Sequence, residues 1–278
     1  MAAGAARPLS RLAVRCARAA RRAAPPLAAI LMAALAAMPA RACLPDAMAD
    51  ALPGSQTLSP TGASAAWYAD PTDIYGHGIM GGVEDASTLA AVIQPDTATC
   101  HVRRVAAGEG HVFEDVSPRL HDVDGDGRPE VIAVRSSLTD GAQLVIYAAR
   151  GDGLELLAAT PFIGRRNRWL APAGIGDLDG DGAVELAYVD RPHLAKRLRI
   201  WRYADGALRE VAALDGVTNH RIGGETIEGG LIRCGEDPIL ILASADWSRR
   251  LAVAFQGGSF ETRDLGPWRD GAPMTCAP

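Results

Sequence analysis

An acidic segment occurs twice in this chain at a fixed spacing, and this repeat constrains the fold more than any other feature of the sequence. Residues 120–134 (LHDVDGDGRPEVIAV) recur 55 positions later as residues 175–189 (IGDLDGDGAVELAYV), with every acidic position matched. A third copy at residues 229–243 is expected to keep the loop length and the apolar strand, but it has lost most of the carboxylates. A period of this size is typical of repeat architectures, in which each unit packs on its neighbours.

Each copy is followed by the same succession of short apolar or alternating segments bounded by Gly or Asp, as expected for strands. The predicted strands are residues 131–134, 143–147 and 154–158; 186–189, 198–201 and 208–212; and 239–242, 251–255 and 260–264. The first strand of each set is apolar on both faces, as a strand buried between neighbouring sheets should be. No long helical period occurs downstream of residue 42.

Residues 75–82 (YGHGIMGG), followed by residues 88–93 and 101–106, are expected to be a further, divergent copy. The sequence therefore predicts an all-β fold, a small β-propeller of about four four-stranded repeats of about 54 residues. This domain would occupy residues 63–278, after a lead-in at residues 43–62. Five blades, or an open partial propeller, are the alternatives.

With these motifs the chain resembles the FG-GAP/VCBS repeat family, the integrin-α-like propellers, whose blades carry an Asp-x-Asp-x-Asp-Gly-x-x-Asp/Glu calcium loop. The resemblance covers residues 120–245, with clear motifs in two repeats. It implies a propeller, calcium in the loops, and an extracytoplasmic role in adhesion or ligand binding.

The residue types in the two loops favour Ca²⁺ independently of that resemblance. Carboxylates at alternate positions of a tight turn converge on one point, and an all-oxygen, flexible, anionic shell selects Ca²⁺ over softer or smaller ions. The expected ligands are Asp122, Asp124, Asp126, the Arg128 carbonyl and Glu130, and Asp177, Asp179, Asp181, the Ala183 carbonyl and Glu185. The loops are not EF-hands, because Ala133 and Tyr188 stand where a bidentate glutamate would be needed. The alternative is an acidic turn that binds nothing.

Residues 1–42 are interpreted as a secretory signal peptide. They contain seven arginines and no acidic residue, and residues 23–40 form an apolar segment with a core too short to span a bilayer. Alternatives are an uncleaved membrane anchor and a lipoprotein modified at Cys43. The mature chain would carry 21 basic and 33 acidic residues, a formal net charge of −12, which disfavours nucleic acid as a partner. We expect a periplasmic or secreted protein with no membrane span in its mature part.

The mature chain contains four cysteines without Cys-x-x-Cys spacing, which in an oxidising compartment predicts two disulfides. Of the three possible pairings we expect Cys43 with Cys276, which would tie the chain ends together, and Cys100 with Cys234.

Polar and aromatic residues upstream of the loops, or following the repeat strands, form a second candidate site. If equivalent positions of successive blades face one surface, they would create a pocket for an anionic or carbohydrate ligand. These residues are Asn167, Arg168, Trp169, Arg191, His193, Asn219, His220 and Arg221. The alternative interpretation is packing and hydrogen bonding between blades.

The sequence contains no Gly-x-Ser-x-Gly, no phosphate-binding glycine-rich loop and no His-Glu-x-x-His. The preferred function is therefore a calcium-stabilised module that binds a protein or glycan ligand. Alternatives are a hydrolase or lyase that uses the Asn/Arg/His pocket, and a purely structural subunit with a large exposed apolar patch.

Overall fold

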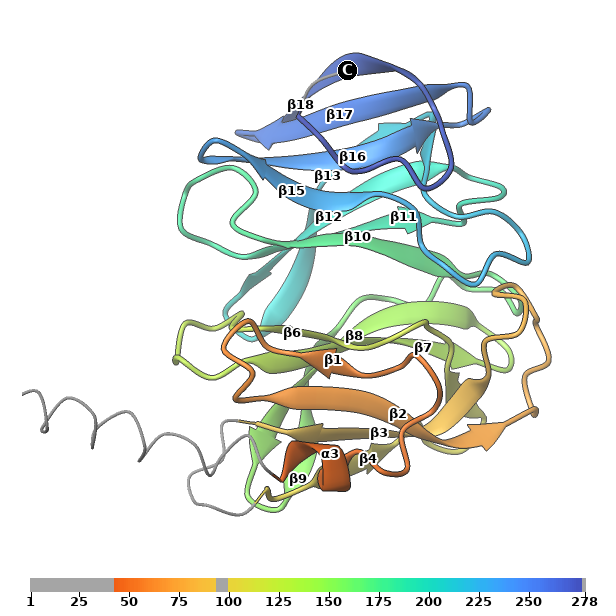
Figure 1. Cartoon of the computed structure of the whole chain (residues 1–278), viewed down its shortest axis with the longest axis vertical. Helices are drawn as coiled ribbons and strands as arrows, with labels where there is room; N and C mark the ends of the chain where they lie inside the picture. Colours follow the sequence, from red (N-terminus) through yellow and green to blue (C-terminus); the bar gives the residue numbers. More distant parts are fainter. Residues whose placement is uncertain (1–42, 94–99, 277–278) are drawn as a thin grey trace, which may run out of the picture. The chain divides into compact units, whose positions relative to one another are not determined.

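The computed structural model describes residues 43–93 and 100–276. The predicted signal peptide, residues 1–42, lies outside the described residues. The described part is all-β apart from one four-residue helix, α3 (Leu44–Ala47) (Figure 1). Within these residues, no helix has the length and apolar character needed to cross a membrane.

The first sheet has nine strands: β1 (Thr57–Leu58), β2 (Ala65–Thr72), β3 (Asp85–Val92), β4 (Arg103–Ala106), β5 (His111–Phe113), β6 (Arg119–His121), β7 (Glu130–Ser137), β8 (Gly141–Arg150) and β9 (Gly153–Ala159). Six of them, in the order β3-β4-β9-β8-β7-β5, close into a barrel. The closure depends on a parallel pairing of β4 with β9 at Arg104 and Gly153, and on β5, which pairs with both β7 and β3.

Two further sheets follow in chain order (Figure 1). The second is the antiparallel series β10 (Leu170–Gly176), β11 (Glu185–Asp190), β12 (Arg197–Ala204) and β13 (Ala207–Asp215). The third contains β14 (Val217–Thr218), β15 (Gly230–Cys234), β16 (Asp237–Ser244), β17 (Arg249–Gln256) and β18 (Ser259–Pro267), with β14 and β15 both paired to β16.

The nine strands predicted after the three copies are confirmed. They lie within β7, β8 and β9, within β11, β12 and β13, and within β16, β17 and β18. Their apolar residues are buried for the expected reason: β11 is buried at every position, because it lies between neighbouring layers of side chains. The all-β, propeller-like character of the fold is therefore as predicted.

The arrangement of the first two strand groups differs from the prediction of separate four-stranded blades. The outer strands β4 and β9 would have been exposed edges, and they pair with each other instead, which merges both groups into one sheet. Residues 75–82 are also not a copy of the acidic loop. They connect β2 to β3, whereas the turn that corresponds to the acidic loops is formed by residues 59–64, between β1 and β2.

The predicted disulfide pairing is wrong. Cys43 pairs with Cys100, and Cys234 pairs with Cys276, with Cα–Cα distances of 5.8 and 5.5 Å. Each bridge joins segments that already lie against one sheet, since Cys43 precedes α3 on the first sheet and Cys276 follows the last strand of the third. The chain ends are thus each fastened locally and are not joined to one another.

Five apolar clusters form the core of the described residues, and three of them are large. The first fills the barrel and contains Tyr68, Phe113 and Tyr147. The second packs the face of β7 and β8 against β10 and β11 and includes the fully buried Trp169. The third lies between the second and third sheets. Successive sheets are therefore held together mainly by apolar burial.

The segment between β2 and β3, residues 73–84, contacts two loops that are distant in sequence; we call it the crossing loop. The Asn167 backbone N–H donates to the Tyr75 hydroxyl at 2.9 Å, in the loop between β9 and β10. The Gly223 N–H donates to the Ile79 carbonyl at 2.9 Å, and the Gly82 N–H donates to the Glu225 carboxylate at 3.3 Å. The crossing loop thus connects the first sheet to the loop between β14 and β15.

Candidate metal sites and a polar pocket

The first acidic loop, residues 122–130, joins β6 to β7 and is organised by its own backbone N–H groups. The Asp122 carboxylate accepts hydrogen bonds from Gly125 N at 2.8 Å and from Gly127 N at 2.9 Å. Both glycines have positive φ (76° and 85°), a conformation that a side chain would resist. Glu130 is 3 % exposed, and one of its carboxylate oxygens accepts from Val123 N at 2.9 Å. These hydrogen bonds orient the carboxylates of Asp122 and Glu130 toward the backbone of the loop.

The second acidic loop, residues 177–185, joins β10 to β11 with nearly the same hydrogen bonds. Asp177 accepts from Gly180 N at 2.7 Å and from Gly182 N at 3.0 Å, and Glu185 accepts from Leu178 N at 2.9 Å. Glu185 is fully buried. The sequence repeat is therefore a repeat of local structure.

In each loop three of the predicted carboxylate ligands converge. Oxygens of Asp122, Asp124 and Glu130 lie within 4.8 Å of one another, as do those of Asp177, Asp179 and Glu185. The third aspartate of each loop is not in this group. Asp126 accepts from Arg128 N at 2.8 Å, and Asp181 accepts from Ala183 N at 2.9 Å. Both acidic clusters could hold a metal ion.

Electrostatics in the first loop favour a cation. Burial raises the pKa of Glu130 to about 7, and the charges of Asp124, Asp126 and Asp122 raise it further against the hydrogen bond from Val123. A cation among these oxygens would relieve the repulsion that the raised pKa reflects. Within residues 43–93 and 100–276, no basic side chain forms an ion pair with the carboxylates of this loop.

The second loop differs because a basic side chain lies among its carboxylates. Arg202, on β12, uses Nε to contact Glu185 at 2.6 Å, Nη2 to contact Asp179 at 2.8 Å and Nη1 to contact Asp181 at 2.9 Å. The other oxygen of Asp179, Oδ1, is buried and has no hydrogen-bond partner. A buried carboxylate oxygen without a donor is a place where an oxygen-preferring cation fits.

The other two turns at the corresponding position are built differently. Residues 59–64, between β1 and β2, are held by hydroxyls: Ser59 Oγ accepts from Ser64 N at 3.0 Å, and Thr61 Oγ1 accepts from Ala63 N at 3.3 Å. The third copy does not keep the loop length as expected. Strands β15 and β16 pair up to Cys234 and Asp237, which leaves a two-residue turn. The aspartates of the other two loops are replaced here by Leu231, Arg233 and Gly235, and the pairing of β15 with β16 continues up to the turn.

A polar pocket of about 190 Å³ gathers five of the eight residues predicted for a ligand site. The residues that line it are His77, Ile79, Asn167, Arg168, Trp169, Arg191, Pro192, His193, Leu194 and Ile222. Two of them, Asn167 and Arg191, have positive φ values of 56° and 45°. Such backbone strain in non-glycine residues is frequent at functional sites.

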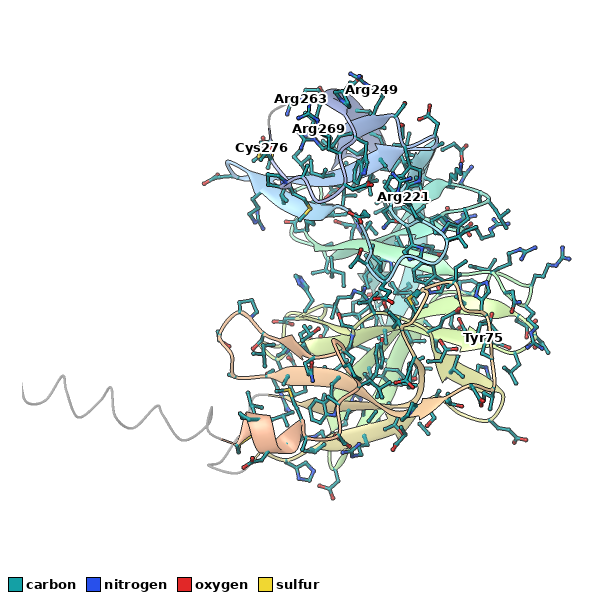
Figure 2. The ribbon with its side chains drawn as sticks, turned by 45° about the vertical axis from the view of Figure 1, so that its right-hand side comes forward. Tyr75, Arg221, Arg249, Arg263, Arg269 and Cys276 are labelled. Carbon is teal, nitrogen blue, oxygen red and sulfur yellow. A yellow bond between two sulfur atoms is a disulfide. The ribbon has the colours of Figure 1, made fainter. Side chains whose placement is uncertain are left out.

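The other three predicted residues have different positions. His220 is buried behind the pocket, where its Nδ1 lies 3.0 Å from His193 Nε2. Asn219 is fully buried and donates to the Ala171 and Pro172 carbonyls. Arg221 is directed toward the last sheet, where it pairs with Asp270 and stacks 4.0 Å from the ring centroid of Trp247 (Figure 2).

The pocket residue His77 and its buried partner Glu114 were not predicted from the sequence. His77 Nδ1 lies 2.6 Å from the carboxylate of Glu114, which is 1 % exposed, and Ser136 donates to the other oxygen of that carboxylate. Burial raises the pKa of Glu114, while the contact with His77 opposes the rise. The available signal was the Gly-His-Gly sequence, in which both glycines have positive φ. The sequence pattern instead places these glycines in the expected repeat segment of residues 75–82.

The pocket imidazoles have different environments. Burial, followed by the neighbouring His220, lowers the pKa of His193 to about 4, so His193 is neutral at physiological pH. His77 has a carboxylate partner that fixes its orientation. A buried carboxylate–imidazole pair that opens on a pocket can bind a ligand or move a proton.

Residues 122–188 match the model of the FG-GAP-like repeat. No curated protein matches the chain. Among solved structures, the chain is similar to "Crystal structure of exotype rhamnogalacturonan lyase YesX", with 13 % identity, a TM-score of 0.44, and coverage of 78 % of this chain and 50 % of that one. The chain thus spans about half the length of that structure. The matched segment begins in the first acidic loop and includes the whole second one, so both loops lie in the part of the chain that is similar to an FG-GAP-like repeat.

Proposed function

We propose that this protein is an exported, calcium-binding β-propeller module that binds a protein or glycan ligand, with structural Ca²⁺ in the acidic loop of residues 122–130. The single observation that carries the calcium assignment is the convergence of oxygens from Asp122, Asp124 and Glu130 on one point. The absence of an ion pair to these carboxylates among the described residues, and the raised pKa of Glu130, support it.

The proposed ion is structural because the loop is a connection between strands. At about 1 mM Ca²⁺ and a dissociation constant of about 0.1 mM, one site adds about 1.4 kcal/mol of stability. This is a useful fraction of the total stability of a domain. The ion would hold β6 and β7 at the point where their pairing ends.

Thermal unfolding in EDTA and in a calcium titration tests this proposal. We expect calcium to raise the midpoint of the disulfide-bonded protein, and Asp124→Asn to remove most of that rise. Glu155→Gln is the matched control, because Glu155 is an exposed acidic residue on β9 outside both loops. A midpoint that does not respond to calcium in the unaltered protein would refute the calcium assignment.

The pocket supports the ligand-binding part of the proposal. Arg168 supplies a cation at its wall, Trp169 lies against it, and Leu194 and Ile222 are exposed apolar residues at its edge. This combination of a charge with apolar surface suits a small carboxylated sugar unit. NMR titration with glucuronate, and with glucose as the neutral control, tests it. We expect glucuronate to shift the NMR signals of the pocket imidazoles and Arg168→Ala to abolish these shifts.

A second candidate function, a hydrolase or lyase, is favoured by one observation. His77 is oriented by the buried Glu114 and lines the same pocket, which is the arrangement of a general base. The test is release of reducing ends from acidic and neutral polysaccharides, with His77→Gln as the control. Release that persists in this variant, or no release from any polysaccharide, would leave the pocket as a binding site.

A further inference from the structure

The two acidic loops have similar backbone structures, but the cation proposed to lie among the carboxylates differs between them. We propose that Arg202 takes the place of the metal in the loop of residues 177–185, so that only the loop of residues 122–130 binds calcium at millimolar concentration. This inference rests on the proposed calcium binding by the first loop. It makes Arg202 the residue that decides how many ions the protein holds.

The first argument is the strand register. Glu185, the last carboxylate of the second loop, lies opposite Arg202 across β11 and β12. In the first repeat Val131 lies opposite Tyr147, so the next position along the strand, beside Glu130, is occupied by Ala148. Alanine cannot reach the carboxylates. The strand register thus places a guanidinium beside the second acidic loop and an alanine methyl group beside the first.

The second argument is the geometry of the contacts. The three guanidinium nitrogens each contact a different carboxylate, at 2.6 to 2.9 Å. Two of the three, Asp179 and Glu185, belong to the group whose oxygens could hold a metal. A planar fork with fixed donors suits several carboxylates at once, and a guanidinium stays charged at every accessible pH. Calcium would have to displace it from both shared ligands.

The third argument is a buried carboxylate oxygen that has no hydrogen-bond partner. Asp179 Oδ1 is buried without a hydrogen-bond partner, because Arg202 contacts only the other oxygen of that carboxylate. The guanidinium therefore satisfies the second loop less completely than an ion with six or more oxygen ligands would. Removing the guanidinium should therefore convert the second loop into a metal site.

Calorimetric titration of the purified, disulfide-bonded protein with CaCl₂ tests the proposal. We expect one ion in the unaltered protein and none in Asp124→Asn. Arg202→Gln should bind two ions, and the Asp124→Asn/Arg202→Gln double variant should bind one. In both variants the affinity of the second loop for calcium should be about tenfold or more higher than when Arg202 is present. Arg199→Gln is the matched control, because Arg199 is on the same strand and pairs with Asp190 and Glu210, outside the loop. It should leave the number of ions unchanged.

The outcomes separate the two proposals. No calcium binding by the unaltered protein refutes the first-loop site, whereas an Arg202→Gln protein that gains no site overturns the role of Arg202. Two ions in the unaltered protein also overturn it, because calcium would then coexist with the guanidinium. If Arg202→Gln fails to fold, Ala148→Arg provides the reverse test. It should weaken binding by the first loop about tenfold or more, and unchanged affinity would overturn the proposal.

Discussion

Replacing Gly81 by alanine should destabilise the protein well beyond the usual effect of such a change. Gly81 lies in the crossing loop with a φ of 61°, and an added Cβ would lie 2.5 Å from the Gly223 carbonyl oxygen. That oxygen is a backbone atom, so a change of rotamer cannot relieve the clash as it could for a side-chain atom. Gly78, in the same loop, has a φ of 62° and open space around its Cβ position, so Gly78→Ala is the matched control.

The magnitude follows from two contributions. A non-glycine residue in the left-handed region costs about 1–2 kcal/mol, and both variants bear this cost. In Gly81→Ala the chain must also move away from Gly223, which breaks the hydrogen bond from Gly223 N to the Ile79 carbonyl, worth about 0.5–1.5 kcal/mol. We expect a loss of about 1–2 kcal/mol for Gly78→Ala and about 1.5–3.5 kcal/mol for Gly81→Ala.

Urea denaturation in saturating calcium measures the difference, as a change in midpoint at constant slope. Equal losses in the two variants would refute the reasoning, because they would mean that the contact between the crossing loop and residue 223 carries no stability. A changed slope would instead indicate that the last sheet unfolds separately.

Three further predictions concern other parts of the molecule. Burial lowers the pKa of His193 to about 4 from its ordinary value of 6.5, so the unfolded chain takes up a proton before the folded protein does as the pH falls. The stability contributed by this group is therefore present above pH 6.5 and is lost as the pH falls toward 4. The free energy of unfolding of His193→Asn should lack this part of the pH dependence. Removing the Cys234–Cys276 bridge by paired serine substitutions should cost about 2–4 kcal/mol in denaturant unfolding, and an unchanged midpoint would contradict this. Glu114→Gln should change the imidazole NMR signals of His77, because the carboxylate that orients the ring is lost.

The strands were predictable because their signal is local. The set 131–134, 143–147 and 154–158 is apolar and bounded by glycine or aspartate, and each segment lies within one strand of the structure. The backbone of the acidic loops was equally predictable, since Asp122 and Gly127, which form a hydrogen bond with each other, lie only five residues apart in the sequence.

Features that depend on contacts across the sheet were not predictable. Arg202 is 17 residues from Glu185, and only the register of β11 and β12 brings them together. The cysteine pairing failed for the same reason, because sequence gives no distance between Cys43 and Cys100. The glycines around His77 resemble those of a repeat turn, so the sequence does not identify His77 as a pocket residue.

The four turns at the corresponding position each depend on a different kind of chemistry: hydroxyls at residues 59–64, a proposed ion at 122–130, a guanidinium at 177–185, and a neighbouring disulfide at Cys234. A chelator should therefore loosen the turn at residues 122–130, and a reductant should loosen the strands at Cys234 while it also opens the Cys43–Cys100 bridge on the first sheet. Turns that correspond in position in the fold are thus sensitive to different components of the medium.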